Sequence, residues 1–119
     1  MSASYLEIQS RMSTFGAAIL TLIDPLKEAS IPASIIDQLV RSGTSVGANY
    51  AEARGAESRA DFLHKLQLSL KECREAKYFL DVLRQNPNTP QRTLTMLLGE
   101  SDEFCAILYS SLMTAKSAQ

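Results

Sequence analysis

The sequence predicts an all-α fold, an antiparallel up-down-up-down four-helix bundle, and three observations carry this prediction. Apolar residues recur at alternating spacings of three and four along four long segments, which is the spacing of one face of an α-helix. Only 5 glycines and 4 prolines occur in 119 residues, too few turn residues for many short strands. The breaks between the segments are short, and helices joined by short connections pack as antiparallel neighbours. We therefore expect one domain over residues 1–119.

The first helix is predicted over residues 4–24 from a single apolar stripe. The stripe consists of Tyr5, Ile8, Met12, Phe15, Ile19 and Leu22. Pro25 has no backbone N–H to donate, so we expect it to end or bend this helix near Ile23 or Asp24.

The second helix is predicted over residues 32–54. Pro32 suits the first turn, where a backbone N–H has no intrahelical acceptor, and Gly55 suits the end. The apolar positions between them are Ile35, Leu39, Val46, Tyr50 and Ala53.

The third helix is predicted over residues 58–86 and the fourth over residues 91–114. Ser58 is a suitable N-cap for the third helix, and Asp61 can support its first turn. The main stripe of the third helix consists of Phe62, Leu66, Ser69, Cys73, Ala76, Leu80 and Leu83. The turn sequence at residues 86–90 separates the two helices, and the tail after Met113 is expected to fray.

Residues 41–53 of the second helix are unusually small and polar for a helix. Gly43 and Gly47 share a helical face with Tyr50, although each glycine costs about 1 kcal/mol relative to alanine inside a helix. Beside this face runs a polar stripe made up of Arg41, Ser45, Asn49 and Glu52. Because small flanks let other helices come close, the segment predicts tight packing and assembly.

The third helix carries apolar residues off its main stripe, among them Leu68, Phe79 and Val82. Each such side chain stabilises by about 1.5 to 3 kcal/mol when buried, and left exposed they would form a patch typical of interfaces. We therefore predict a homo-oligomer. The alternative is a monomer with scattered exposed apolar residues, which are common.

Arg41 and Glu72 each lie near the middle of their helix, and two interpretations stay open. They either form a buried pair across the bundle, in which case losing one partner would be costly, or both point to solvent.

The charge balance bears on nucleic-acid binding. A formal net charge of -1 does not provide the basic surface of a dedicated nucleic-acid binder. A looser basic cluster consists of Arg54, Arg59, Lys65, Lys71, Arg74, Lys77 and Arg84, and the first six of these are the candidate nucleic-acid residues. Acidic residues are interleaved with it, which favours a solvated face with intrahelical ion pairs, although an oligomer would repeat any modest basic patch around its axis.

No residue pattern predicts a catalytic, cofactor-binding, metal or small-molecule site. His64, the single histidine, has no metal-binding or catalytic partner at helical spacing, and the Glu-x-x-His pattern of di-iron bundles is missing. Cys73 and Cys105 are too far apart in the sequence to indicate a zinc site or redox pair, so we expect buried free thiols. No apolar run has the length of a membrane span, and no targeting segment is evident, which predicts a cytoplasmic protein.

A specific set of residues follows the second and third helices almost end to end. It comprises Ile31-Pro32, Gln38-Leu39, Arg41-Ser42, Thr44–Tyr50, Glu52-Ala53, Ser58, Asp61-Phe62, Lys65, Leu70–Glu72, Glu75 and Tyr78–Leu80. Together these residues resemble the bacterial four-helix bundle family whose founding members are encoded in intervening sequences of 23S ribosomal RNA genes. Phe79 is a departure, since the family often has tryptophan there.

The resemblance implies an antiparallel four-helix bundle that forms homopentamers with a central channel. A related branch comprises accessory proteins of diversity-generating retroelements, basic rings that bind a reverse transcriptase and nucleic acid. The resemblance assigns Arg41, Ser45, Asn49, Glu52 and Glu72 structural or interface roles. Two hypotheses follow: a non-enzymatic, oligomeric assembly or adaptor protein, or an accessory ring that binds RNA or DNA and possible partner enzymes.

Overall fold

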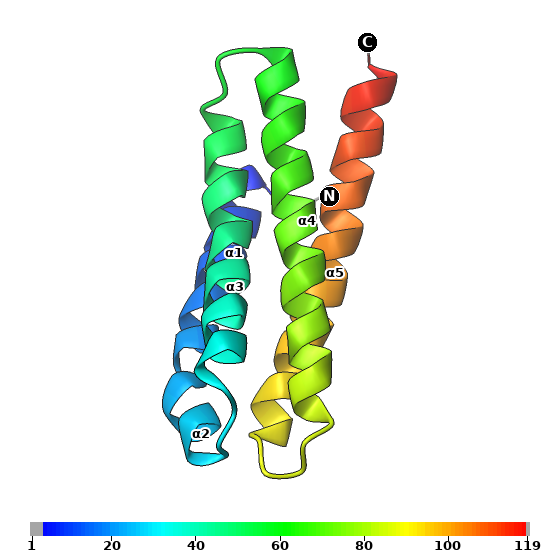
Figure 1. The fold of residues 1–119 in the computed structure, drawn as a ribbon. Coiled ribbons are helices and arrows are strands. Elements are labelled where there is room, and N and C mark those ends of the chain that lie inside the picture. Colours follow the sequence, from blue (N-terminus) through cyan, green and yellow to red (C-terminus); the bar gives the residue numbers. More distant parts are fainter. Residues whose placement is uncertain (1–3, 119) are drawn as a thin grey trace.

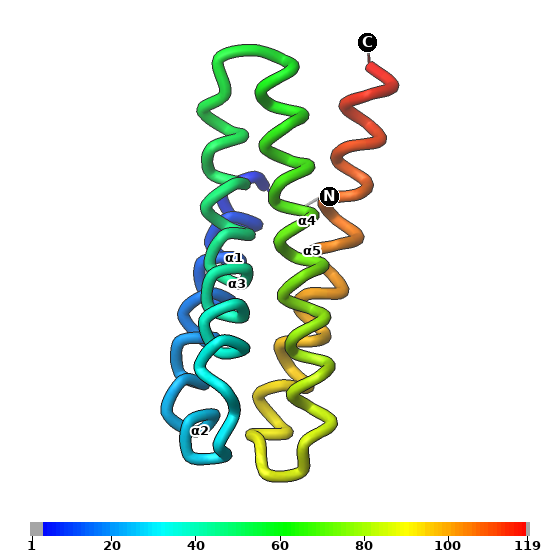
Figure 2. Tube along the Cα trace, viewed as in Figure 1, coloured from blue at the N-terminus to red at the C-terminus, as the bar shows by residue number. Residues whose placement is uncertain are grey.

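The computed structural model describes residues 4–118, and these residues form five helices (Figure 1). They are α1 (Tyr5–Leu20), α2 (Ile23–Glu28), α3 (Ala33–Arg54), α4 (Arg59–Arg84) and α5 (Gln91–Ser117). The four long helices lie side by side, and the chain reverses direction from each to the next, as the tube in Figure 2 shows. The predicted all-α four-helix bundle is confirmed. The predicted domain also included residues 1–3 and 119, which lie outside the described residues.

The predicted C-terminal end of the first helix is wrong. Instead of one helix over residues 4–24, α1 ends at Leu20 and the short α2 begins at Ile23. Pro25 is the third residue of α2, in the first turn, where its missing N–H leaves no hydrogen bond unmade. Leu22 and Leu26 are both buried and hold this turn against the core.

The other helices end within a few residues of their expected limits, for local reasons. Ser58 is the N-cap of α4, and its Oγ accepts a hydrogen bond from the Asp61 backbone N–H at 3.0 Å. Pro32 and Pro90 precede α3 and α5. The expected fraying after Met113 is wrong, because α5 continues to Ser117.

The core runs the length of the bundle and is built from one stripe on each long helix. On α3, Ile36 is buried where Ile35 was expected, and Ile35 is half-buried. Phe15 of α1 meets Phe104 of α5 edge to face, with ring centroids 5.5 Å apart. A buried hydroxyl is satisfied between helices: Ser69 Oγ donates to the Val46 carbonyl oxygen at 2.7 Å.

The α1/α3 seam, where Met12 and Ile19 meet α3, uses glycine to bring two helices together. A Cβ at Gly43 would lie 2.1 Å from Ile19 Cδ1, and one at Gly47 would lie 3.2 Å from Met12 Cβ. Tyr50 is buried in the same seam, where its ring stacks on Tyr5 at 4.1 Å between centroids. The close approach that the small residues predicted is therefore made by α1 of the same chain.

Arg11 fastens α1 to α5. Its guanidinium donates to Glu100 at 2.9 Å and to Glu103 at 3.0 Å, and lies 5.1 Å from the centroid of the Phe104 ring. The guanidinium lowers the pKa of the Glu103 carboxyl through this hydrogen bond and its charge.

Candidate functional site

The outer side of α3 and α4 gathers most of the predicted interface residues, and we call it the α3/α4 face. Its members are Arg41, Ser45, Asn49 and Glu52 of α3 and Leu68, Glu72, Glu75, Phe79 and Val82 of α4. They follow one another at helical spacings of three and four, so each helix presents them on one side.

Charged residues join the two helices on this face. Arg41 Nη1 lies 2.7 Å from Glu72 Oε2, and Arg41 also pairs with Glu75. The Arg41 side chain is 47% exposed and that of Glu72 13%, so the pair forms within one chain at the border of the core. Gln38 accepts two further hydrogen bonds from Arg41, each at 3.2 Å. The side chain of Arg41 is therefore held by three partners.

Uncharged polar residues of this face bond to their own helix. Ser45 Oγ donates to the Arg41 carbonyl at 2.6 Å, and the Asn49 amide donates to the Ser45 carbonyl at 2.9 Å. Both side chains therefore lie flat on α3, while Glu52 is exposed.

Apolar residues lie at the α4 side of the same face. Leu68 and Phe79 are half-buried, whereas Val82 is 41% and the adjoining Tyr78 64% exposed. The Tyr78 and Phe79 rings meet edge to face, with centroids 5.5 Å apart. Gly43, Gly47 and Tyr50 are not part of this surface, because they pack on α1 in the seam described above.

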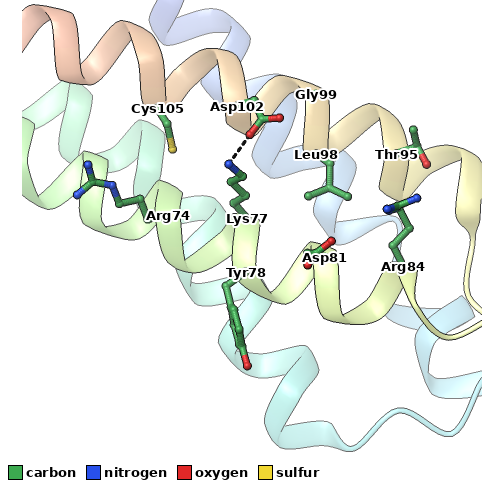
Figure 3. A pocket seen from close by; sticks show the side chains of 10 residues that line it. All are labelled: Arg74, Lys77, Tyr78, Asp81, Arg84, Thr95, Leu98, Gly99, Asp102 and Cys105. Atoms are coloured by element: carbon green, nitrogen blue, oxygen red, sulfur yellow. Dashed lines mark ion pairs between the residues drawn. The ribbon is translucent and has the colours of Figure 1, made fainter.

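A second surface is an open groove of about 830 Å³ between α4 and α5, the α4/α5 groove (Figure 3). Its lining residues are Arg74, Lys77, Tyr78, Asp81 and Arg84 of α4, and Thr95, Leu98, Gly99, Asp102 and Cys105 of α5. Lys77 Nζ lies 2.5 Å from Asp102 Oδ1 across it. Gly99 leaves the α5 side open, since an added Cβ would meet nothing within 4 Å.

The α4/α5 groove carries a positive charge on an acidic chain. It continues past Arg74 into a hollow of about 340 Å³ that Lys71, Tyr109 and Lys116 help to line. Together the two parts hold five basic side chains and two carboxylates, a formal +3, although the whole chain carries -1. The charges are therefore segregated, with acidic residues in excess elsewhere.

The predicted nucleic-acid residues divide between this groove and other places. Lys71, Arg74 and Lys77 line the groove. Arg54 lies over the Tyr5 ring at 5.9 Å from its centroid, and Arg59 donates to the Ala115 carbonyl, so both lie outside its lining.

Lys65 is half-buried on α4 and is also not among the groove residues. The groove also holds Arg84, which was part of the predicted basic cluster but not a candidate nucleic-acid residue, and Lys116, which was in neither set. Arg84 follows Lys77 by two turns on the same side of α4, so the helical period could have predicted that it lies beside Lys77. Nothing in the sequence pattern places Lys116 beside α4.

The two cysteines lie close together although they are far apart in the sequence, and both are free thiols as expected. Cys73 is buried, and its Sγ donates to the Ser101 carbonyl oxygen at 3.4 Å. In an α-helix that same oxygen accepts the backbone N–H of Cys105, so the Cys73 sulfur lies against the Cys105 turn. Cys105 is half-buried rather than buried, and lines the α4/α5 groove.

The thiols influence each other's pKa in opposite directions. The pKa of Cys105 is lowered to about 7, first because the Cys73 thiol can donate a hydrogen bond to its thiolate, and then because Lys77 and Arg74 are close. Burial and the Asp102 carboxylate oppose this shift. The pKa of Cys73 is raised, by that hydrogen bond and by burial, so Cys73 stays a thiol.

Two further properties concern residues 4–118. No group of three or more potential metal ligands is gathered within that part of the chain. None of the helices there has the length and apolar character needed to cross a bilayer.

Comparison with known proteins identifies the family. Residues 5–110 match the sequence model of the 23S rRNA-intervening sequence protein family. The chain belongs to this family. The family resemblance predicted from the α3 and α4 residues is therefore confirmed. No curated protein matches the chain.

A solved structure is similar over nearly the whole chain. It is a protein of unknown function of the S23 ribosomal protein family from Bacteroides thetaiotaomicron, 32% identical to this chain, with a TM-score of 0.80. The match covers 88% of this chain and 97% of that one. The bundle of this chain is thus shared with a relative of clearly different sequence.

Proposed function

We propose that this chain is a cytoplasmic, non-enzymatic assembly or adaptor protein that works as a homo-oligomer through its α3/α4 face. The expected oligomer is a pentamer, which is the state that the family resemblance implies. The observation that supports this proposal most is the exposure of Tyr78 and Val82 beside half-buried Leu68 and Phe79. Leu68, Phe79 and Val82 form the apolar half of the α3/α4 face, next to the Arg41 ion pairs, and Tyr78 borders this face on the side of the α4/α5 groove.

The composition of the α3/α4 face suits an interface between copies. Burying an exposed valine or tyrosine stabilises a complex by about 1.5 to 3 kcal/mol each, and interfaces are enriched in tyrosine and arginine. Arg41, Glu72 and Glu75 already pair within the chain, so a second copy would not have to neutralise an unpaired Glu72. The Ser45 and Asn49 side chains are bonded to carbonyls of their own helix, which satisfies these donors before a neighbouring helix packs on them.

Light scattering at micromolar concentration tests the proposal, with a mass of several chains as the expected result. Val82→Glu should reduce the mass to that of one chain without unfolding the protein, because Val82 is already 41% exposed in the single chain. Met96→Glu is the matched control: Met96 is 55% exposed on α5, outside the α3/α4 face, so its replacement should leave the mass unchanged. A wild-type monomer at that concentration would refute the proposal.

A second candidate is binding of RNA or DNA by the α4/α5 groove, as an accessory protein of a nucleic-acid enzyme such as a reverse transcriptase. The observation that favours it is the formal +3 of the groove, flanked by the exposed rings of Tyr78 and Tyr109. Cations bind phosphates and aromatic rings stack on bases.

Binding of labelled RNA at low salt, weakening steeply as salt is raised, is the expected result for this second candidate. Replacing Lys71, Arg74 and Lys77 by glutamine should abolish the binding. Replacing Lys27, Arg54 and Arg59 removes the same charge from outside the groove and should have a smaller effect. No binding at low salt would exclude this function.

A further inference from the structure

The cysteines contribute to neither proposed function, yet their arrangement is specific. The chain has only 2 cysteines, and the fold places one behind the other between α4 and α5. Cys105 lines the open groove together with Arg74 and Lys77 of α4, and Figure 3 shows its sulfur pointing from α5 towards α4. Cys73 lies beneath it, fully buried, with its sulfur against the Ser101 carbonyl at 3.4 Å.

We propose that Cys105 is an oxidation site that reacts with hydroperoxides, and that Cys73 then captures the oxidised Cys105 as an intrachain disulfide between α4 and α5. Only Cys105 can meet a reagent, because Cys73 has no exposed surface. Cys73 is the only other thiol of the chain, and its sulfur lies against the turn of α5 that leads to Cys105. The roles of attacking and resolving cysteine therefore follow from position alone.

The reaction has two balanced steps. The Cys105 thiolate attacks the terminal oxygen of a hydroperoxide; an S–O bond forms, the O–O bond breaks, and the leaving alkoxide takes a proton from solvent. Cys105 becomes a sulfenic acid, oxidised by two electrons, and the peroxide is reduced to an alcohol, or to water if it is hydrogen peroxide. The Cys73 thiol then attacks the Cys105 sulfur and passes its proton to the sulfenic acid oxygen as the S–O bond breaks, so that an S–S bond forms and water leaves.

The charged groups around Cys105 favour the first step. The thiolate is the reactive form, and nearby cations stabilise it. Lys77 and Arg74 face it from α4, and Asp102 is the opposing carboxylate on α5. The cations outnumber the carboxylate, and the Cys73 thiol adds a hydrogen-bond donor on the buried side.

The small residues of this layer suit the second step. Ala76 follows Cys73 by one turn on the buried side of α4, and Ser101 precedes Cys105 by one turn on α5. Residues of this size leave little bulk between the two helices, as a disulfide between them requires.

Peptide mapping by mass spectrometry tests the proposal on the reduced full-length protein after hydrogen peroxide treatment. The expected product is a linked Cys73–Cys105 peptide pair, two hydrogens lighter than the two thiols. In Cys73→Ser, the sulfenic acid should persist and be trapped by dimedone on Cys105. Cys105→Ser should leave Cys73 reduced. Circular dichroism checks that each variant folds, and Cys73→Ala serves if the serine variant does not.

Reaction rates provide a matched control for the charges. Lys77→Gln should slow peroxide consumption at neutral pH severalfold, whereas Lys27→Gln, on α2 and outside the α4/α5 groove, should not. Oxidation of Cys105 no faster than that of free cysteine would overturn the proposal. Disulfides formed only between separate chains, or a dimedone adduct found on Cys73, would overturn it as well. Each result is independent of oligomeric mass and RNA binding.

Discussion

The α1/α3 seam and the α4/α5 groove use glycine in opposite ways. At Gly43 an added Cβ would lie 2.1 Å from Ile19 Cδ1 and 3.4 Å from Ile19 Cγ1, in a fully buried environment. At Gly99 an added Cβ would meet nothing within 4 Å. The first glycine is needed for two helices to touch, and the second leaves a space that no other side chain fills.

The polar groups of the two regions also differ in their exposure to solvent. In the α1/α3 seam, Tyr5 Oη donates to the Tyr50 carbonyl at 2.5 Å, beneath stacked rings. In the α4/α5 groove, the Lys77–Asp102 pair and its neighbours are open to water. The difference indicates that the α1/α3 seam holds the bundle together, whereas the α4/α5 groove is available for ligands and chemistry.

Replacement of Gly43 by leucine is expected to have the largest effect. Overpacking against Ile19 costs about 3 kcal/mol, and the better helix propensity of leucine offsets about 1 kcal/mol, so the free energy of unfolding should fall by about 2 kcal/mol. Urea unfolding followed by circular dichroism measures this loss. Gly99→Leu is the matched control, with the same change of side chain in open space, and should not destabilise. Equal losses in the two variants would remove the contrast between the regions.

Tyr5→Phe tests the hydrogen bond of the α1/α3 seam. The variant keeps the stacked ring but leaves the Tyr50 carbonyl without this donor, so stability should fall by about 1 kcal/mol in urea unfolding at neutral pH. Unchanged stability would show that water replaces the hydroxyl and that the seam is less closed than its distances indicate.

The pH dependence of the same bond has a definite sign. Burial, and then the Tyr50 phenol, raise the pKa of Tyr5 from 10.0 to about 12, which favours the protonated, folded form. Its contribution is therefore complete below about pH 10 and is lost as the pH rises towards about 12. The stability difference between wild type and Tyr5→Phe should shrink over that interval. A constant difference would contradict the assignment.

Periodicity and capping residues allowed the bundle to be predicted because each acts within one helix. The α4 stripe from Leu66 to Leu83 is buried as expected, and Ser58 caps that helix. The break after Leu20 could not be predicted, because a proline such as Pro25 is compatible both with ending one helix and with the first turn of the next.

Contacts between helices were harder to predict. The sequence showed that Gly43 needs a close neighbour, but it could not say that the neighbour is Ile19 of the same chain and not another copy. The Arg41–Glu72 pair was one of two open alternatives. The meeting of Cys73 and Cys105 was missed, because it depends on the register between α4 and α5, which no periodicity within either helix fixes.

Gly99→Ala should stabilise the protein, because the α4/α5 groove leaves open space at this position. Alanine is favoured over glycine inside a helix by about 0.5 to 1 kcal/mol, and no contact at this position opposes the gain. Thermal unfolding should show a higher midpoint. Gly43→Ala is the control, since its extra methyl must displace Ile19, and it should gain less or lose stability. Destabilisation by Gly99→Ala would indicate that the groove is filled.

The smallest effect on stability is expected at Asp102. Its ion pair with Lys77 is 2.5 Å long, but the side chains are 60% and 47% exposed, so Asp102→Asn should change the free energy of unfolding by less than about 0.5 kcal/mol. The variant should nevertheless lower the pKa of the Cys105 thiol further, because the Asp102 carboxylate opposes the thiolate charge. Alkylation of Cys105 by iodoacetamide below neutral pH should therefore become faster while the urea midpoint stays in place. Glu100→Gln is the control: Glu100 lies two residues before Asp102 on α5 but pairs with Arg11, so its replacement should leave the alkylation rate unchanged. An Asp102→Asn protein with altered stability and unaltered alkylation would show that the groove charges act on the fold, as the α1/α3 seam does, and not on the thiol.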